Sequence, residues 1–342
     1  MAPASGTPTA TPVGVLGTGS YLPSRVVSNE EVGHPAGVDG AWIETKTGIL
    51  SRRWAAADEA TSDLAAHAAR AACAAAGLDP GELDYLVVAT STPDQPQPPT
   101  ACLVAHLIGA RRAAAFDLNA VCSGFVFGLA TVSRLVGRGG YGLVIGADVY
   151  SRILDPTDRR TVVLFGDGAG AVVLGPVPAG HGVLDTRLVS DGGHHRLIEV
   201  PAGGSRMPAS PATLADGQHY FRMLGRDVRD YVAEHVPPML RELIGATGLA
   251  PAGVDHFVPH QANGLMLADL ADRVGLAGQV RLTVREFGNT GAASVPITLD
   301  KTVHGVGVRP GQTVLLTAFG GGMAMGAAML RWSAGLPAQR AA

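Results

Sequence analysis

The strongest constraint on the fold of this chain is an internal repeat. The segment Gly77–Pro80, with an apolar run shortly after it, returns 171 positions downstream as Gly248–Pro251, again followed by an apolar run. The same offset aligns Gly142–Ala147 with Thr313–Ala318. A register that holds without gaps over several segments indicates two copies of one structural unit.

The repeat predicts two halves of similar architecture. We expect them to span residues 12–184 and 185–333, with flexible tails at 1–11 and 334–342. Short apolar, β-branched runs alternate with helical patterns, such as the Ala-rich helix that begins at Thr61 and stops at Gly77. Strands of this kind are buried on both faces, and their alternation with helices is typical of an α/β fold with stacked layers. The expected strands include Leu86–Thr90, Leu143–Ile145, Phe257–Val258 and Val314–Thr317.

The composition indicates a compact enzyme. Of 342 residues, 46% are hydrophobic and only 16% are charged, which argues against a disordered or fibrous chain. The net charge of −3 gives no reason to expect nucleic acid or an anionic membrane as a partner, and no run is apolar enough to span a bilayer. The three cysteines lack zinc spacing, and the first residues lack the pattern of a signal peptide. We therefore expect a protein of the reducing cytoplasm.

Cys122 is the main candidate for a catalytic residue. It lies where an apolar strand is followed by an apolar helix that begins near Phe125. At such a position, the N–H groups of the first helical turn and the helix dipole favour a thiolate and can also hold an oxyanion. Cys73 and Cys102 lie inside helical patterns and are expected to be core residues.

Two downstream residues could assist this thiol. His260 follows a predicted strand in Pro-His-Gln-Ala-Asn, and Asn289 lies in Phe-Gly-Asn-Thr-Gly. Taken singly, such a histidine is often a core residue, and Asn-Thr-Gly is a common turn. Their placement at strand ends of the two repeated units, together with Cys122, favours acyl transfer through a thioester. His194 and His195 have no carboxylate or cysteine at ligand spacing, so a polar loop is expected there and no metal site.

The sequence resembles the thiolase superfamily and, within it, ketoacyl-acyl-carrier-protein synthase III. The resemblance implies an α/β fold of two pseudo-symmetric halves, stacked in five layers as α-β-α-β-α. The matching segments cover nearly the whole chain: Gly17–Pro23, Trp42–Ile49, Asn119–Phe125, Asp155–Arg159, Phe165–Ala171, Val258–Asn263, Gly288–Pro296 and Ala318–Gly322.

The resemblance also implies a mechanism. Cys122 takes an acyl group from acyl-CoA, and the N–H groups of Cys122 and Gly321 form the oxyanion hole. A malonyl thioester, normally carried by an acyl carrier protein, then loses CO₂ while His260 and Asn289 donate hydrogen bonds to its carbonyl. The resulting carbanion attacks the acyl-cysteine and gives a 3-ketoacyl thioester. No metal or redox cofactor takes part, and the family members are homodimers.

For the CoA nucleotide, the resemblance implies that Trp42 and Lys46 flank the adenine, with Arg152 opposite. Lys46 stands where relatives commonly have Arg, which removes a planar stacking partner. Asn263 is expected to steady the site through a water molecule or the pantetheine arm. The alternative for Trp42 is a half-buried structural residue beside a solvated Lys46.

Two departures from the family pattern bear on the substrates. Gln97 stands where housekeeping relatives often place an aromatic residue that closes the partner subunit's acyl pocket, so an acyl group bulkier than acetyl is expected. The helix after Asn263 has Leu265 and Asp272 where relatives place basic residues that grip the carrier protein. Either nearby arginines compensate, or the carrier differs, or the acceptor is not a carrier protein. The arginines concerned are Arg222, Arg226, Arg229 and Arg273.

Three functions remain open from the sequence. The leading one is a starter condensation of fatty-acid or, more in keeping with the departures, specialised polyketide biosynthesis. The second is transfer of an acyl group to an alcohol or amine of a small molecule on the same fold. The third is a non-catalytic paralogue that partners an active synthase, against which the intact Cys122, His260 and Asn289 argue.

Overall fold

Two central β-sheets organise the molecule. The computed structural model describes residues 11–137 and 139–335, so most of both predicted tails lies outside the described residues. The first sheet has the strand order β1 (Val13–Tyr21), β7 (Gly168–Pro176), β6 (Gly142–Asp148), β4 (Tyr85–Ala89), β5 (Ala114–Leu118). The second has the order β8 (Gly182–Ser190), β13 (Ala324–Arg331), β12 (Thr313–Gly320), β11 (His256–Pro259).

The two sheets share one topology. In the first sheet β7 pairs antiparallel with β1 and β6, and β6 pairs parallel with β4. In the second sheet β13 pairs antiparallel with β8 and β12, and β12 pairs parallel with β11, which is the same pattern. The strands β11 and β12 begin 171 residues after β4 and β6, which is the offset of the sequence repeat.

The copies differ in two respects. The fifth strand, β5, has no counterpart among the described residues of the second half, where the short helix α9 (Val284–Phe287) occupies the corresponding stretch. The strand β8 begins at Gly182, so the boundary predicted between residues 184 and 185 falls inside a strand of the second sheet. The sheets are instead joined by the turn after Pro176.

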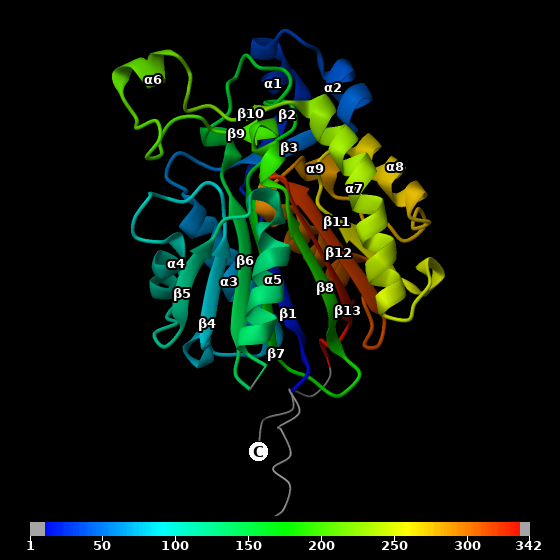
Figure 1. Cartoon of the computed structure of the whole chain (residues 1–342). Coiled ribbons are helices and arrows are strands. Elements are labelled where there is room, and N and C mark those ends of the chain that lie inside the picture. Colours follow the sequence, from blue (N-terminus) through cyan, green and yellow to red (C-terminus); the bar gives the residue numbers. More distant parts are fainter. Residues whose placement is uncertain (1–10, 138, 336–342) are drawn as a thin grey trace, which may run out of the picture.

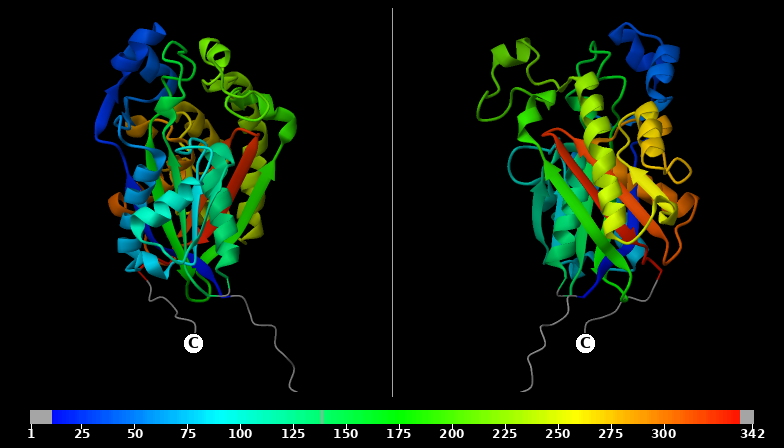
Figure 2. Two further views of the ribbon diagram at one scale, coloured as in Figure 1. Left: turned by 90° about the vertical axis from the view of Figure 1, so that its left-hand side faces the viewer. Right: turned by 45° about the vertical axis from the view of Figure 1, so that its right-hand side comes forward.

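Helices cover the sheets in three layers, which completes the α-β-α-β-α arrangement expected from the resemblance. On the outer face of the first sheet lie α3 (Thr61–Ala76) and α4 (Thr100–Ile108). Between the sheets lie α5 (Gly124–Leu135) and α10 (Ser294–Gly305). On the outer face of the second sheet lie α7 (Gly225–Ala246) and α8 (Gly264–Arg273); α7 crosses this face in Figure 2.

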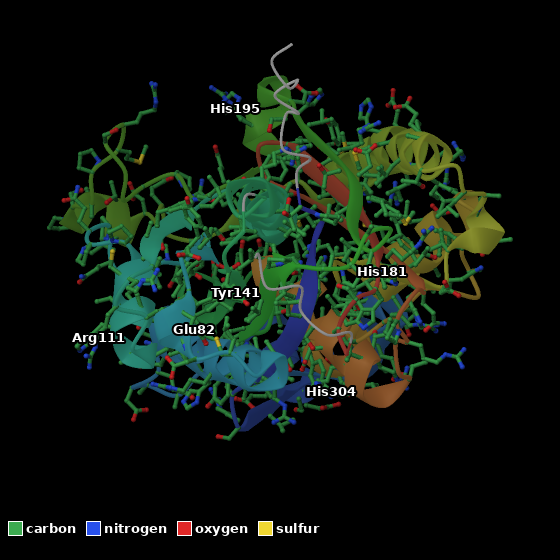
Figure 3. All side chains as sticks on the ribbon, turned by 90° about the horizontal axis from the view of Figure 1, so that it is seen from below. Glu82, Arg111, Tyr141, His181, His195 and His304 are labelled. Atoms are coloured by element: carbon green, nitrogen blue, oxygen red, sulfur yellow. The ribbon has the colours of Figure 1, made fainter. Side chains whose placement is uncertain are left out.

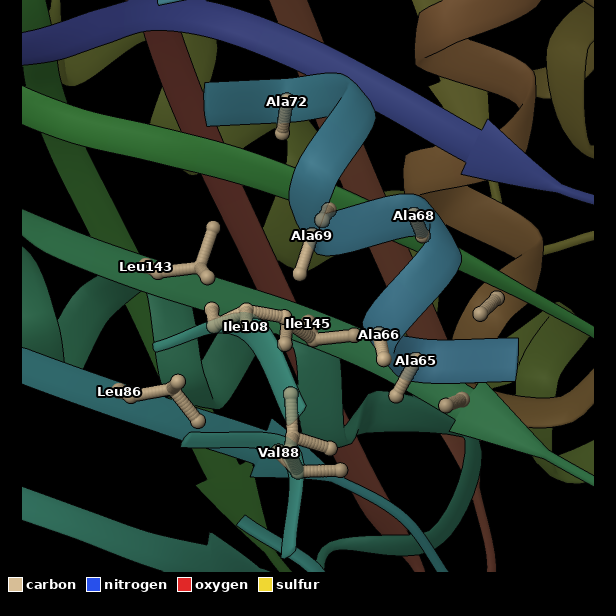
Figure 4. Packing of buried hydrophobic residues seen from close by; sticks show 14 of the residues in the cluster. Ala65, Ala66, Ala68, Ala69, Ala72, Leu86, Val88, Ile108, Leu143 and Ile145 are labelled. Carbon is tan, nitrogen blue, oxygen red and sulfur yellow. The ribbon is translucent and has the colours of Figure 1, made fainter. Parts of the chain in front are cut away.

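Alternation along the strands divides the core between these layers. In β6, Leu143 and Ile145 pack under α3, whereas Val144 points into the central layer. In β12, Leu315 packs under α7 and Leu316 into the central layer. Both faces of each sheet are therefore buried, because successive side chains of a strand point to opposite faces. Figure 4 shows the alanines of α3 packed on Leu86, Val88, Leu143 and Ile145.

The Ala-rich helix α3 lies unusually close to the first sheet. A Cβ at Gly19 of β1 would come within 2.4 Å of the backbone nitrogen of Ala72, so a larger residue there would displace the helix. The helix begins at Thr61 as expected, but its N-cap residue is Ala60, whose N–H donates to the Asp63 carboxylate. It ends at Gly77, which adopts the left-handed conformation at φ 63°.

Smaller elements lie above one end of both sheets, as Figure 1 shows. None of the helices in the described part of the chain is long and apolar enough to cross a membrane. The smaller elements are β2 (Arg25–Ser28), α1 (Asn29–Ala36), α2 (Gly40–Thr47), β3 (Ser51–Trp54), β9 (Ile198–Glu199), α6 (Pro211–Ala215) and β10 (Arg222–Met223).

Candidate active site

Cys122 lies on a sharp turn between β5 and α5. The preceding residue, Val121, has φ 49°, and it is the one non-glycine residue with positive φ in the described part of the chain. A β-branched residue in this region is strained, so the surrounding structure must hold it there. Asn119 does so by accepting the Val121 N–H at 3.0 Å, and the Ser123 hydroxyl donates to the Ala324 carbonyl in the other half at 2.8 Å.

The second half closes on Cys122 through the turn after β12. A Cβ at Gly320 would lie 2.8 Å from the Cys122 Cβ and 2.9 Å from its nitrogen, so only glycine fits there. The next residue, Gly321, lies against Val121 and Ile198. The backbones of the two halves thus meet at Cys122. An oxyanion hole needs backbone N–H groups at such a place, and the role of Gly321 stays a prediction.

The electrostatics of Cys122 differ from the sequence-based expectation of a thiolate. Burial, with a smaller contribution from Asp148, raises the pKa of the thiol to about 12. Hydrogen bonding from Tyr150 and from the backbone acts in the opposite direction but is outweighed. Only 6% of the residue is exposed, so removal from water dominates over the helix N-terminus. At neutral pH Cys122 is therefore a neutral thiol.

His260 follows β11 and is fixed by the second sheet. Its backbone N–H donates to the Thr317 carbonyl at 2.7 Å, and its ring meets the Phe319 ring edge-on at 5.5 Å. Burial lowers the pKa of the imidazole to about 3, so the ring is neutral at physiological pH. Its buried Nδ1 has no hydrogen-bond partner among the described residues, so the fold does not use the full hydrogen-bonding capacity of the ring.

Asn289 is held by a ladder-like contact between the halves. Its N–H donates to the Leu164 carbonyl at 2.8 Å, and its carbonyl accepts the Gly166 N–H at 2.9 Å. The side-chain oxygen accepts the Gly291 N–H at 2.9 Å. Because the oxygen is used inside the turn, the amide NH₂ remains to donate to a ligand.

One cavity of about 880 Å³ brings these three side chains together. Cys122, His260 and Asn289 all line it, although they come from different strand ends of the two halves. A thiol can take up an acyl group, and a neutral histidine and an amide can stabilise an enolate by donating hydrogen bonds. None of these three groups needs to change its charge near neutral pH.

The outer part of the same cavity carries the residues predicted for CoA. Trp42, Lys46 and Asn263 line it. Asn263 has a structural role, because its oxygen accepts the N–H groups of Leu265 and Met266 at the start of α8. Its amide nitrogen donates to the Lys46 carbonyl at 3.1 Å, so Asn263 joins α8 to α2.

The arginine opposite Trp42 is Arg159, and not Arg152 as expected. The guanidinium carbon of Arg159 lies 5.8 Å from the centre of the Trp42 ring, and Arg159 lines the cavity. Arg152 instead donates to the carbonyls of Ala56 and Glu59, which hold its side chain over the connection before α3. The sequence contained an indication of this position, because Arg159 ends the segment Asp155–Arg159, which is one of the segments that resemble the family.

Three aromatic rings, which sequence reasoning missed, form the wall near Cys122. Tyr150 stacks on Phe165 at 4.5 Å, and Phe221 meets both rings edge-on at 5.5 and 5.0 Å. Phe165 and Phe221 line the cavity. Gln97 does not line it, because the loop that carries it is exposed on the surface of the chain.

No metal site accompanies this cavity in the described residues. They contain no group of three or more potential metal ligands, and His195, His181 and His304 lie far apart in Figure 3. His194 instead pairs with Asp191 at 2.8 Å. Cys73 is buried in the core as expected, whereas Cys102, predicted to be a core residue, is exposed on α4.

Comparisons with known proteins agree on one family. The family model of 3-oxoacyl-[acyl-carrier-protein] synthase III matches residues 116–192, and the model of its C-terminal part matches residues 244–332. An acetoacetyl CoA synthase of Streptomyces sp. strain CL190 is 56% identical over 93% of this chain and 98% of its own length.

Solved structures give the same result. The 3-oxoacyl-(acyl carrier protein) synthase III of Pseudomonas aeruginosa superposes with a TM-score of 0.87 at 40% identity, over 95% of this chain and 100% of that chain. A priming beta-ketosynthase of a polyketide pathway superposes with a TM-score of 0.89 at 34% identity, over 97% of this chain and 99% of that chain.

The raised pKa of Cys122 gives a testable pH dependence. Only the thiolate reacts with iodoacetamide, so the rate of Cys122 alkylation should still rise about tenfold per pH unit near pH 9.5. A small thiol with an ordinary pKa of about 8.5 should approach its plateau there. Quenched time courses, with the adduct on Cys122 quantified by mass spectrometry, measure both. A plateau for Cys122 below about pH 8 would show that the helix N-terminus prevails over burial.

Proposed function

Because the chain belongs to the 3-oxoacyl-[acyl-carrier-protein] synthase III family of acyl-transferring condensing enzymes, we propose that it joins a short acyl group from acyl-CoA to a malonyl thioester, with Cys122 as the nucleophile. The observation that carries the proposal is the convergence of Cys122, His260 and Asn289 on one cavity from both halves of the fold.

The first step is acylation of Cys122. The sulfur attacks the thioester carbonyl, the bond to the CoA sulfur breaks, and the thiol proton leaves with CoA as its free thiol. The backbone N–H groups beside Cys122 stabilise the oxyanion of the tetrahedral intermediate. Since the thiol is neutral at rest, the proton must leave as the sulfur attacks, so a CoA thiolate that departs nearby is the natural acceptor.

The second step is decarboxylation and condensation. The bond between the malonyl carboxylate and its α-carbon breaks, CO₂ leaves, and the electron pair forms an enolate of the thioester. His260 and the NH₂ of Asn289 donate to the enolate oxygen. The α-carbon then attacks the acyl carbonyl, and the Cys122 thiolate leaves and takes up a proton. Because loss of CO₂ supplies the carbanion, the reaction needs no metal or redox cofactor.

We propose a small starter acyl group. Tyr150, Phe165 and Phe221 occupy the space beside Cys122 in the same subunit, which limits the length of the acyl chain. This wall weighs against the bulkier starter expected from Gln97, because that expectation rested on the loop alone. The name of the Streptomyces relative, an acetoacetyl CoA synthase, also favours an acetyl group.

We propose malonyl-CoA as the acceptor, in place of a malonyl carrier protein. Two of the four arginines that could grip an acidic carrier are paired on their own helices, because Arg273 pairs with Asp269 at 2.6 Å and Arg229 with Asp230 at 2.8 Å. The other two, Arg222 and Arg226, form no salt bridge in the described residues. Lys46 and Arg159, beside Trp42, form no salt bridge in the described part of the chain and suit CoA phosphates. The cysteines Cys73, Cys102 and Cys122 form no disulfide in the described residues, which supports our proposal of a cytoplasmic enzyme.

Replacing His260 or Asn289 should separate the two steps. Decarboxylation of malonyl-CoA in His260→Ala and Asn289→Ala should fall by about 100-fold or more, because each loses a hydrogen bond to the enolate. Single-turnover acylation of Cys122 should fall much less, since its oxyanion hole is backbone. Release of labelled CO₂ and the mass of acylated Cys122 measure the two steps.

Equal loss of both steps would contradict this division of labour. Acyl transfer from acyl-CoA to an alcohol or amine without CO₂ release from malonyl-CoA would favour the alternative acyltransferase. Cys122→Ala provides the control, because it should abolish acylation while retaining the donors of the decarboxylation site.

The acceptor is tested with three donors of the same malonyl group. We expect kcat/KM for malonyl-CoA to exceed that for a malonyl carrier protein by about tenfold or more, and malonyl-pantetheine, which lacks the nucleotide, to be poor. Trp42→Ala should lower kcat/KM for malonyl-CoA but not for malonyl-pantetheine. Preference for the carrier protein, lost selectively in Arg273→Ala, would identify the carrier as the acceptor.

We also propose a homodimer that pairs through the edge strand β5. Its outer edge has no partner in the described chain, and the neighbouring loop of Gln97 is exposed. Sedimentation velocity at micromolar concentration should therefore give about twice the mass of one chain. A charged substitution in this strand, Ala115→Glu, should shift the protein toward monomer, and a monomeric wild-type protein would refute the proposal.

A further inference from the structure

Asp148 is a fully buried carboxylate without a cationic partner. It ends β6, has 0% exposure, and forms no salt bridge with any described residue. Burial raises the pKa of this carboxyl group, which the surrounding hydrogen bonds only partly counter. A buried acid that the fold compensates entirely with hydrogen-bond donors is costly to keep, so its contacts deserve a functional explanation.

One oxygen of Asp148 holds the turn that carries Asn289. Its Oδ2 accepts the Ala292 N–H at 2.7 Å. The neighbouring Gly291 has φ 58°, and a Cβ there would lie 2.3 Å from Oδ2, so only glycine allows the carboxylate to approach. The N–H of Gly291 in turn fixes the side-chain oxygen of Asn289. The orientation of the Asn289 amide therefore depends on Asp148 through two consecutive backbone groups.

The other oxygen holds the segment after β4 in the first half. Its Oδ1 accepts the Thr90 hydroxyl at 3.1 Å, the Ser91 N–H at 2.9 Å and the Thr92 hydroxyl at 2.8 Å. The Ser91 hydroxyl, 3.2 Å from the same oxygen, contacts the Tyr150 hydroxyl at 2.9 Å. One carboxylate thus connects the first half, where Cys122 lies, with the catalytic turn of the second half.

From these contacts we infer that Asp148 is a positioning residue for decarboxylation, which it controls by fixing the Asn289 amide toward the malonyl carbonyl. The inference rests on the proposed function and goes beyond it, because Asp148 does not line the cavity and touches no substrate. An asparagine cannot replace it. With its oxygen toward the donors of the first half, its NH₂ faces the Ala292 N–H, and two donors then meet without an acceptor.

Asp148→Asn should therefore impair one step selectively. We expect kcat for malonyl-CoA decarboxylation to fall by about 30-fold or more, with the KM for malonyl-CoA changed by less than about threefold. Single-turnover acylation of Cys122 should not slow, because loss of the Asp148 charge lowers the pKa of the thiol. Asp300→Asn is the matched control. Asp300 is also buried and accepts the hydroxyls of Thr18 and Ser20 at 2.7 and 2.6 Å, but it lies on α10 away from the Asn289 turn. It should leave the ratio of the two steps unchanged.

A double-mutant cycle distinguishes positioning from general damage. If Asp148 acts through Asn289, Asp148→Asn should cause no further loss of decarboxylation in an Asn289→Ala background. Additive losses, equal losses of acylation and decarboxylation, or the same change of ratio in Asp300→Asn would overturn the inference. Should Asp148→Asn be insoluble, Asp148→Glu carries the same prediction, because its longer side chain moves the carboxylate away from the Ala292 N–H.

The proposed function can fail separately. If the wild-type protein releases no CO₂ from malonyl-CoA, or if Asn289→Ala decarboxylates normally, the assignment of Asn289 is wrong and Asp148 cannot act through it. If Asn289→Ala loses decarboxylation while Asp148→Asn does not, the proposed function stands and only the role of Asp148 is refuted.

Discussion

The central helical layer is the constraint on which the rest of this structure depends. The helices α5 and α10 are buried between two sheets, and each half contributes one helix and one sheet face to a single apolar cluster. Neither half could bury this layer alone, so the two copies must fold together. The N-termini of both helices then meet at the same end of the molecule. Packing there leaves only 6% of Cys122 exposed, and both helices begin directly after the turns that carry Cys122 and Asn289.

Each half positions a candidate catalytic residue of the other. Asp148 ends β6 of the first half and fixes the turn of Asn289 in the second, whereas Gly320 ends β12 of the second half and closes on Cys122 in the first. The residue at the repeat offset from Asp148 is Phe319, which supports the ring of His260. Residues at equivalent strand ends of the two repeats therefore make different contacts in the site. The reactive geometry depends on the register between the halves as much as on either half alone.

Sequence reasoning reached the features that repeat or that form local patterns. The offset between Gly77 and Gly248, the end of α3 at a glycine and the buried strands follow from local chemistry, and the fold is confirmed. What it missed depends on distances between segments remote in the chain. Arg159 lies opposite Trp42 because a turn after Asp155 directs its side chain there. The importance of Asp148 is visible only in its hydrogen bond with the Ala292 N–H of the other half.

The expectation of a thiolate at Cys122 differs from the structure for another physical reason, which bears on the chemistry of the site. A helix N-terminus favours a thiolate, but the same packing that aligns the helix removes the thiol from water, and the second effect is larger. The pKa of His260 is lowered to about 3 by the same burial. In the proposed condensation Cys122 carries the acyl group and His260 is neutral, so neither side chain is an acid that would readily protonate the enolate. In the proposed mechanism, hydrogen bonds from His260 and Asn289 then stabilise the carbanion without transferring a proton to it.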